Sequence, residues 1–204
     1  MQLVLATSNL HKILELKAIL KDRLEGVELF SLKDFPYYVA PEENGKTFLE
    51  NAEIKAMHAA AALKMYALAD DSGLVVPALN GEPGIFSRRY ASEKATDKEN
   101  RDKLVAKLRL LPEEARMGYY ECALSFASPE RILKTTLGVC EGTLILEARG
   151  GSGFGYDPLF LKHDYNRTMA ELGEDIKNRI SHRRKAFDKL LPIFEAQRSL
   201  LTSS

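Results

Sequence analysis

The sequence contains no tryptophan, carries no net charge, and has no hydrophobic run near the roughly 20 residues that span a bilayer. A net charge of zero provides no general positive field for nucleic acid polymers or anionic membranes, and RNA-binding faces are rich in basic and aromatic side chains. The N-terminal MQLVLATSNLHK turns polar too early for a signal peptide. We therefore expect a cytoplasmic protein that binds neither membranes nor nucleic acid polymers.

Cysteine is also scarce. Cys122 and Cys140 are the two in the chain, and both lie in apolar runs typical of strands. Because a buried thiol behaves as a small hydrophobic side chain, we favour two buried thiols over a disulfide or a pair of metal ligands.

The chain length suits one domain, or one domain with two lobes, and we predict a single domain over residues 1–204. Helical and strand-like patterns alternate along the chain, with capping-box spacing at Thr47–Glu50 and Thr96–Glu99. Predicted helices follow Ser8 or Asn9, occupy 47–65 and 96–111, and begin near 181. Predicted strands occupy 3–6, 27–30, 67–69, 74–79, 118–127, 132–140 and 142–146. This alternation predicts an α/β fold with a long mixed sheet flanked by helices.

Two adjacent acidic residues, Asp70 and Asp71, interrupt the apolar residues around ADDSGL. Neighbouring carboxylates repel each other and lose hydration energy when buried. A plain Asp-Ser-Gly turn between two strands would leave them in water, and this alternative stays open. Together with Glu42 and Glu43, they could instead provide the hard oxygen ligands that Mg²⁺ prefers. A cation or a transferable proton would then offset their charge.

Two segments could bind phosphate. Residues 7–12 lie between the first strand and the first helix, where free backbone N–H groups and Lys12 could meet an anion, although the glycines of a P-loop are absent. Arg88 and Arg89 could form a guanidinium clamp. Taken singly, each segment is also explained by a capped turn or a surface charge.

Two further segments could contact a base. The glycine-rich residues 150–158 carry Phe154 and Tyr156, and an aromatic ring on a flexible loop can stack on a base. This segment lacks the GxGxxG pattern of a dinucleotide fold. Residues 181–184 place basic side chains at a helix N-terminus, against the helix dipole, and such local conflicts often occur at functional sites.

The order and spacing of these segments are more specific than any one of them. TSNLHK, EENG-T-F-x-E-N-A, ADDSGL, PG-x-x-S-x-RY, GGSGFGYDPLF and SHR together resemble the inosine triphosphate pyrophosphatase family, the XTP/dITP diphosphatases, over residues 3–195. The resemblance implies an elongated α/β fold with two lobes, a central cleft and usually a homodimer. It also implies Mg²⁺-dependent hydrolysis of dITP, ITP and XTP to the monophosphate and pyrophosphate, which removes these nucleotides from the pool.

The resemblance assigns roles by position. Asp71 would be the general base, and Glu42 and Asp71 would bind the metal; a one-position shift in the alignment would exchange Glu42 and Glu43. Asp70 should point to the other side of the strand and support the turn. The remaining matched positions would bind the substrate: Thr7, Ser8, Asn9, Leu10, His11, Lys12 and Lys55 the triphosphate, Ser72 the nucleotide, Arg89 an anionic group, and Phe154, Gly155, Tyr156, Asp157, Lys177, His182 and Arg183 the base.

One position departs from the family, and two rival functions remain. Bacterial members usually have a small residue where this chain has Arg88, which is either an extra phosphate ligand or a surface charge. The septum-formation-inhibitor-like pyrophosphatases share the fold, but they carry an arginine-rich turn after the first strand, unlike TSNLHK. A catalytically silent nucleotide-binding module is disfavoured by the intact acidic residues.

Overall fold

The computed structural model describes residues 1–23 and 25–202, and the chain divides into two compact units. Unit 1 comprises Met1–Asp71, Cys122–Gly138 and His182–Ser204, and unit 2 comprises Ser72–Glu121 and Val139–Ser181. Three long strands contribute residues to both units. With this division, the single domain over 1–204 stays a prediction.

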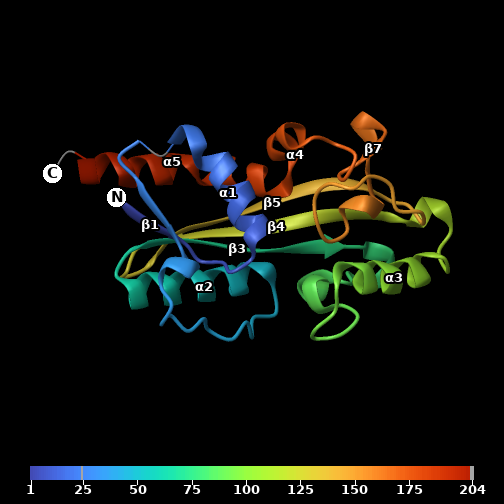
Figure 1. Ribbon diagram of the computed structural model, residues 1–204, viewed down its shortest axis with the longest axis horizontal. Helices are drawn as coiled ribbons and strands as arrows, with labels where there is room; N and C mark the ends of the chain where they lie inside the picture. Colours follow the sequence, from blue (N-terminus) through green and yellow to red (C-terminus); the bar gives the residue numbers. More distant parts are fainter. Residues whose placement is uncertain (24, 203–204) are drawn as a thin grey trace. The chain divides into compact units, whose positions relative to one another are not determined.

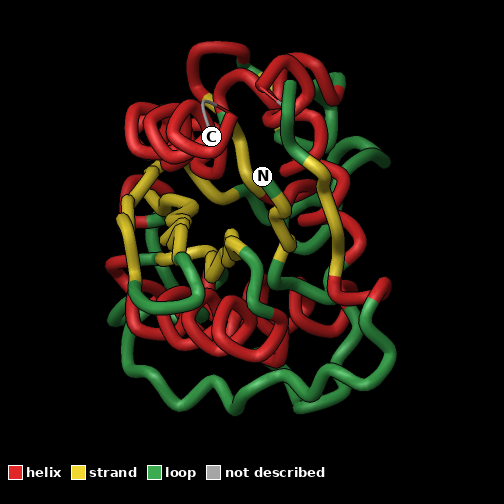
Figure 2. Tube along the Cα trace, turned by 90° about the vertical axis from the view of Figure 1, so that its left-hand side faces the viewer, coloured by secondary structure: helices red, strands yellow, loops and turns green. Residues whose placement is uncertain are grey.

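The strands form a seven-stranded sheet in the order β2-β1-β3-β4-β5-β6-β7. β1 pairs in parallel with β2 and β3, whereas β6 pairs antiparallel with β5 and β7, so the sheet is mixed as predicted. Within unit 1, helices lie on both sides of the strands (Figures 1 and 2). The strand bounds are Gln2–Leu5, Glu28–Ser31, Tyr66–Val75, Met117–Ala127, Ile132–Leu144, Phe160–Lys162 and Arg167–Thr168 for β1 to β7.

In unit 1, strand alternation builds two different cores. Leu5 and Leu68 pack with α1 (Leu10–Leu20) and α5 (His182–Thr202), whereas Val4, Ala67 and Ala69 pack with the alanine face of α2 (Phe48–Leu63). Figure 1 shows α2 on the opposite face of the sheet from α1 and α5. Because side chains alternate along β3, Asp70 follows Leu68 toward one core and Asp71 follows Ala69 toward the other.

Unit 2 has one core, which gathers Leu74, Leu104, Tyr156 and Phe160 with other buried apolar side chains. The core packs against α3 (Asp97–Leu108) and includes Leu172, close to the start of α4 (Glu174–Ile180). The capping box predicted at the start of α3 is confirmed, because the side chains of Thr96 and Glu99 each accept the other's backbone N–H. Helix α4 was not predicted from the sequence.

Two predicted turns are wrong. ADDSGL lies inside β3, not between two strands. Of the strand predicted at 74–79, Leu74 and Val75 belong to β3, and a 3-10 turn follows over Pro77–Leu79. The predicted break after Cys140 is also wrong, since β5 continues to Leu144. A Cβ on Gly142 would lie 2.5 Å from the Leu161 carbonyl oxygen, so this glycine allows close packing within the sheet and does not form a turn.

The expectation for the two cysteines holds. Cys122 and Cys140 are buried thiols. Among the described residues, no helix has both the length and the apolar composition needed to cross a membrane.

Candidate active site

The N-terminus of α1 is capped by Asn9. Its side-chain Oδ1 accepts hydrogen bonds from the backbone N–H groups of His11 and Lys12, at 3.0 and 3.3 Å. The backbone N–H of Asn9 in turn donates to Thr7 Oγ1 at 3.2 Å. The sequence predicted free backbone N–H groups at this terminus, but those of His11 and Lys12 are already paired with Asn9. Lys12 and the exposed Ser8 lie at the same turn.

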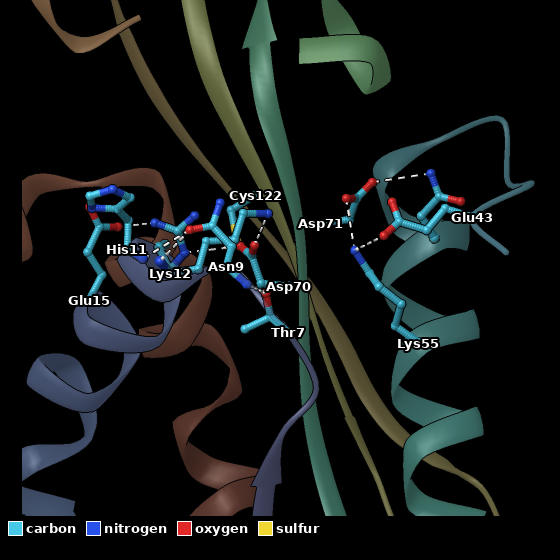
Figure 3. A network of polar contacts seen from close by, with 12 residues as sticks. Thr7, Asn9, His11, Lys12, Glu15, Glu43, Lys55, Asp70, Asp71 and Cys122 are labelled. Atoms are coloured by element: carbon cyan, nitrogen blue, oxygen red, sulfur yellow. Dashed lines mark hydrogen bonds and ion pairs between the residues drawn. The ribbon is translucent and has the colours of Figure 1, made fainter. Parts of the chain in front are cut away.

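Asp70 is fully buried and lies among cationic and thiol partners from three other elements. Lys12 of α1 forms an ion pair with its Oδ1. Arg183 Nε, at the start of α5, lies 3.1 Å from Oδ2, and the Cys122 thiol of β4 donates to the same oxygen at 2.9 Å. Arg183 also pairs with Glu15 of α1. Figure 3 shows the labelled members of this cluster on the α1 side of β3.

The charges of this cluster determine the ionisation of Asp70. Burial alone would raise the pKa of the carboxyl, but Arg183, Lys12 and the Cys122 thiol bring that pKa well below its usual value. Burial and the same carboxylate raise the pKa of the Cys122 thiol well above normal. Asp70 is therefore a permanent anion that holds two cations, and Cys122 stays a neutral hydrogen-bond donor.

Asp71 faces the other side of β3 and meets α2. Lys55 Nζ lies 3.0 Å from Oδ1, and Asn51 Nδ2 donates to Oδ2 at 3.2 Å. Lys55 Nζ is also 3.4 Å from Glu43 Oε1. Figure 3 shows Asp71, Glu43 and Lys55 turned toward one another and away from Asp70. Asp71 is 8% exposed to solvent, whereas Asp70 is 0% exposed.

The electrostatics of Asp71 are opposite to those of its neighbour. Burial raises the pKa of Asp71, and the opposing effects of Lys55 and Lys12 do not fully cancel it. Burial works against the charge of Lys55, but Asp71 and Glu43 outweigh it and raise the pKa of the ammonium. Asp71 is therefore a carboxylate with a higher proton affinity than an ordinary aspartate, next to a firmly charged lysine.

Asn51 connects Asp71 to the acidic loop. Its Oδ1 accepts the backbone N–H of Gly45 at 2.9 Å while its amide nitrogen contacts Asp71. A Cβ at Gly45 would lie 2.6 Å from Asn51 Oδ1, so the loop can close on Asn51 only with glycine there. Asn51 lies within one of the family motifs, but no role was predicted for it. Its spacing of one helical turn from Lys55 was the available signal.

The loop and Asp71 together offer carboxylates for a metal ion. Within the described residues, no three His, Cys, Asp or Glu side chains gather into a complete metal site. Mg²⁺ commonly uses one or two protein carboxylates and takes its other ligands from phosphates and water. Asp71 and Glu43 both contact the Lys55 ammonium, so two carboxylates lie close together, and carboxylate oxygens are the donor type that such an ion takes. Glu42, the predicted ligand, is exposed beside Glu43.

In unit 2, Asp157 organises the aromatic loop. Its buried carboxylate accepts hydrogen bonds from Lys177 Nζ at 2.7 Å, Tyr120 Oη at 3.1 Å and the backbone N–H of Phe154 at 3.0 Å. The ammonium of Lys177 lies 4.7 Å from the centre of the Phe154 ring. The Tyr156 hydroxyl donates to the Ser87 carbonyl oxygen at 2.9 Å. Hydrogen bonds therefore hold the loop on both sides of Gly155, at Phe154 and at Tyr156.

The arginine pair differs in its surroundings. Arg89 Nε is 3.7 Å from Glu93 Oε1, and its guanidinium stacks over Phe86 at 5.5 Å, whereas Arg88 is exposed. The predicted site residues divide between the units. Residues 7–12, Glu42, Lys55, Asp71, His182 and Arg183 belong to unit 1, and Ser72, Arg89, residues 154–157 and Lys177 belong to unit 2. Glu15 and Cys122, which sequence reasoning did not select, join the unit 1 cluster.

Known proteins resemble the chain over almost its whole length. A dITP/XTP pyrophosphatase from Protochlamydia amoebophila is 54% identical over 196 residues, which cover 96% of this chain and 98% of that protein. A dITP/XTP pyrophosphatase from Chlamydia abortus is 48% identical over 196 residues, covering 96% of this chain and 95% of that protein.

Solved structures agree with these sequence relatives. The Staphylococcus aureus Ham1 protein matches with a TM-score of 0.84 and 38% identity, over 97% of this chain and all of that chain (100%). A nucleoside-triphosphatase / dITP/XTP pyrophosphatase from Mycobacterium abscessus matches with a TM-score of 0.77 and 38% identity, over 94% of this chain and 100% of that one. The sequence model of the Ham1 family matches residues 3–193. The family resemblance drawn from the motifs is thereby confirmed, and the chain belongs to the Ham1 family.

Proposed function

We propose that this protein is an enzyme that hydrolyses non-standard purine nucleoside triphosphates, namely dITP, ITP and XTP, to the monophosphate and pyrophosphate. Its relatives at 54% and 48% identity are named dITP/XTP pyrophosphatases. Water attacks the α-phosphorus, the bond to the bridging oxygen breaks, and pyrophosphate leaves. The enzyme in this way removes unwanted nucleotides from the pool.

The observation that carries the assignment is the different surroundings of the two aspartates on opposite sides of β3. Asp70 is paired with Lys12, Arg183 and Cys122, whereas Asp71 has one ammonium, which Glu43 also contacts. A general base must be ionised yet retain affinity for a proton. Asp71 meets this requirement, and Asp70 does not, so we assign Asp71 as the base that accepts a proton from water.

Mg²⁺ is the proposed cofactor, held by Asp71 and by Glu42 or the neighbouring Glu43. When bound, such an ion neutralises phosphate charge and stabilises the leaving pyrophosphate. Lys55 lies 3.0 Å from Asp71 and fixes its carboxylate. Asn51 holds the other carboxylate oxygen and the loop that carries the glutamates. These contacts keep the donor atoms oriented before the substrate arrives.

The remaining residues bind the two ends of the nucleotide. Residues 7–12 and Lys55 bind the triphosphate, with Arg89 as a further cation and Ser72 at the nucleotide. Phe154 stacks on the base, and the other base-binding positions are Gly155, Tyr156, Asp157, Lys177, His182 and Arg183. A 6-oxo group accepts from N–H donors such as His182 or Arg183, whereas the 6-amino group of adenine leaves those donors unpaired. Rejection of guanine then depends on its 2-amino group.

We further propose that the chain acts as a single pyrophosphatase domain, forms a homodimer, and works in the cytoplasm without a membrane or nucleic acid partner. Sedimentation velocity over a range of concentrations tests the dimer directly. A single monomeric species at every concentration would contradict it.

A substrate panel tests the function. The purified protein is incubated with dITP, ITP, XTP, dGTP, dATP and dCTP, with and without Mg²⁺, and nucleotide products and pyrophosphate are separated. We expect monophosphate and pyrophosphate from the 6-oxo non-standard nucleotides, in a metal-dependent reaction. Diphosphate with inorganic phosphate would contradict the cleavage site. Binding of dITP without any turnover would favour the silent nucleotide-binding module.

A further inference from the structure

Helix α3 contacts the backbone of the aromatic loop through two side chains. Asp97 Oδ2 accepts the backbone N–H of Gly155 at 2.6 Å, and Arg101 Nη1 donates to the Gly155 carbonyl oxygen at 2.7 Å. Asp97 and Arg101 are four residues apart, and therefore neighbours on one face of the helix. Both polar groups of a single loop residue are thus held by one turn of α3, entirely within unit 2.

The residue that is held is a glycine, the residue type with the most backbone freedom. Gly155 has φ of +60°, in the left-handed region that favours glycine, and it lies between Phe154 and Tyr156. Gly150, Gly151 and Gly153 precede it, so the segment has little intrinsic stiffness. Asp157 fixes the backbone N–H of Phe154, and Ser87 fixes the hydroxyl of Tyr156. The peptide groups between these two anchors are fixed by Asp97 and Arg101.

We propose that Asp97 and Arg101 are positioning residues that hold the loop in the conformation in which Phe154 presents its ring to the purine. This inference rests on the proposed function, in which Phe154 stacks on the base. Neither side chain has to touch the substrate. Their effect is to order the loop before binding, so the substrate does not have to immobilise it.

If Asp97 and Arg101 served only to stabilise the fold, their removal would lower the stability of unit 2. Asp97 is exposed and Arg101 is only half-buried, so water can replace their hydrogen bonds if the loop opens. Their removal should therefore loosen the loop without unfolding unit 2, because neither side chain belongs to its buried apolar core. Lys98 and Asp102 provide a matched control, since they form an exposed pair on the same helix at 2.6 Å.

The absence of tryptophan permits a direct test. A Phe154→Trp variant carries a single indole in the loop, and its quenching by acrylamide reports how open the loop is. On this background, Asp97→Ala and Arg101→Ala should each raise the quenching constant at least about twofold, as expected for local opening. Lys98→Ala should leave it unchanged. Asp97→Asn keeps an oxygen acceptor for the Gly155 N–H and should restore most of the protection.

Kinetics in the background with Phe154 intact provide the second measurement. Asp97→Ala and Arg101→Ala should raise KM for dITP by roughly 2- to 12-fold, the effect of ordering one side chain, with kcat and thermal midpoint nearly unchanged. The fluorescence measurement needs no turnover, so it decides the loop contact even if dITP is not a substrate. Quenching equal to that of Lys98→Ala in both alanine variants would overturn the proposal. Loosening without any change in KM would also overturn it, because the contacts would then not serve binding.

Discussion

Asp70 and Asp71 are consecutive residues of one strand, yet the two faces of β3 give them opposite properties. On the α1 and α5 face, two cations and a thiol surround a fully buried carboxylate and bring its pKa well below normal. On the α2 face, one lysine is shared with Glu43, and burial keeps the pKa of Asp71 raised. The difference teaches that the charges and hydrogen bonds around each carboxylate, and not burial alone, separate a structural anion from a candidate base.

The largest effect on stability is expected from Asp70→Asn. The substitution keeps the shape but removes the charge that Lys12 and Arg183 share, and Arg183 stays buried. Breaking a buried ion pair by removing one partner costs about 3–5 kcal/mol. We expect a loss of that size in the free energy of unfolding, measured by urea denaturation. A loss no greater than that of Asp71→Asn would mean that the carboxylates on the two faces of β3 contribute equally to the free energy of unfolding.

The pH dependence of stability sharpens the same comparison. The folded pKa of Asp70 lies below that of an unfolded aspartate, about 3.9, so its stabilisation is complete above that pH and disappears as the pH falls through the folded pKa. Asp71 has a raised folded pKa, so its ionised form reduces stability at neutral pH, and this cost disappears on acidification. The stability difference between the wild type and Asp70→Asn should therefore be constant near neutrality and shrink below about pH 4. A difference that grows on acidification would contradict this.

A smaller effect is expected at Asn51, on the Asp71 side. Asn51→Ala removes the hydrogen bond to Asp71 and the acceptor for Gly45, and unpaired buried polar groups cost about 1–3 kcal/mol. Asn51→Asp retains the acceptor for Gly45 but places a second carboxylate against Asp71. We expect Asn51→Asp to preserve stability better at acid pH and to shift the acidic limb of the turnover profile upward. Identical profiles for Asn51→Asp and the wild type would argue against this contact.

The smallest effect is expected from Cys122→Ser. Cys122→Ser keeps a donor to Asp70 and should change the free energy of unfolding by less than about 1 kcal/mol, whereas Cys122→Val removes the donor and should cost about 1.5–3 kcal/mol, the range for hydrogen bonds to charged groups. Thermal and urea denaturation of the two variants measure the difference. Equal losses would show that the thiol contributes packing only.

Local signals predicted much of this fold. The mixed α/β class, the capped helices α2 and α3, and the opposite directions of Asp70 and Asp71 all follow from periodicity and capping, which act over a few residues. The family is likewise readable from motif order and is confirmed by the relatives. The roles assigned to individual site residues stay predictions.

The errors arise where distant residues override local preference. Asp-Asp-Ser-Gly is typical of a turn, but Lys12 and Arg183, far away in the chain, offset the charge that would otherwise favour water. Asp70 consequently supports no turn and instead holds α1 to the start of α5. The sequence around Gly138 likewise does not indicate its role. Gly138 lets α5 approach β5, because a Cβ there would lie 2.0 Å from the His182 carbonyl oxygen.

The paired variants Asp70→Asn and Asp71→Asn test the central claim most directly, by pyrophosphate release from dITP and by urea denaturation at a temperature where both are folded. We predict that Asp71→Asn keeps its stability within about 1 kcal/mol and loses turnover by at least about 100-fold, as expected for a lost general base. Asp70→Asn should lose stability, and per folded molecule it should retain more turnover than Asp71→Asn. Near-normal turnover in Asp71→Asn, together with loss of turnover in folded Asp70→Asn, would contradict the account and assign the chemistry to the other aspartate.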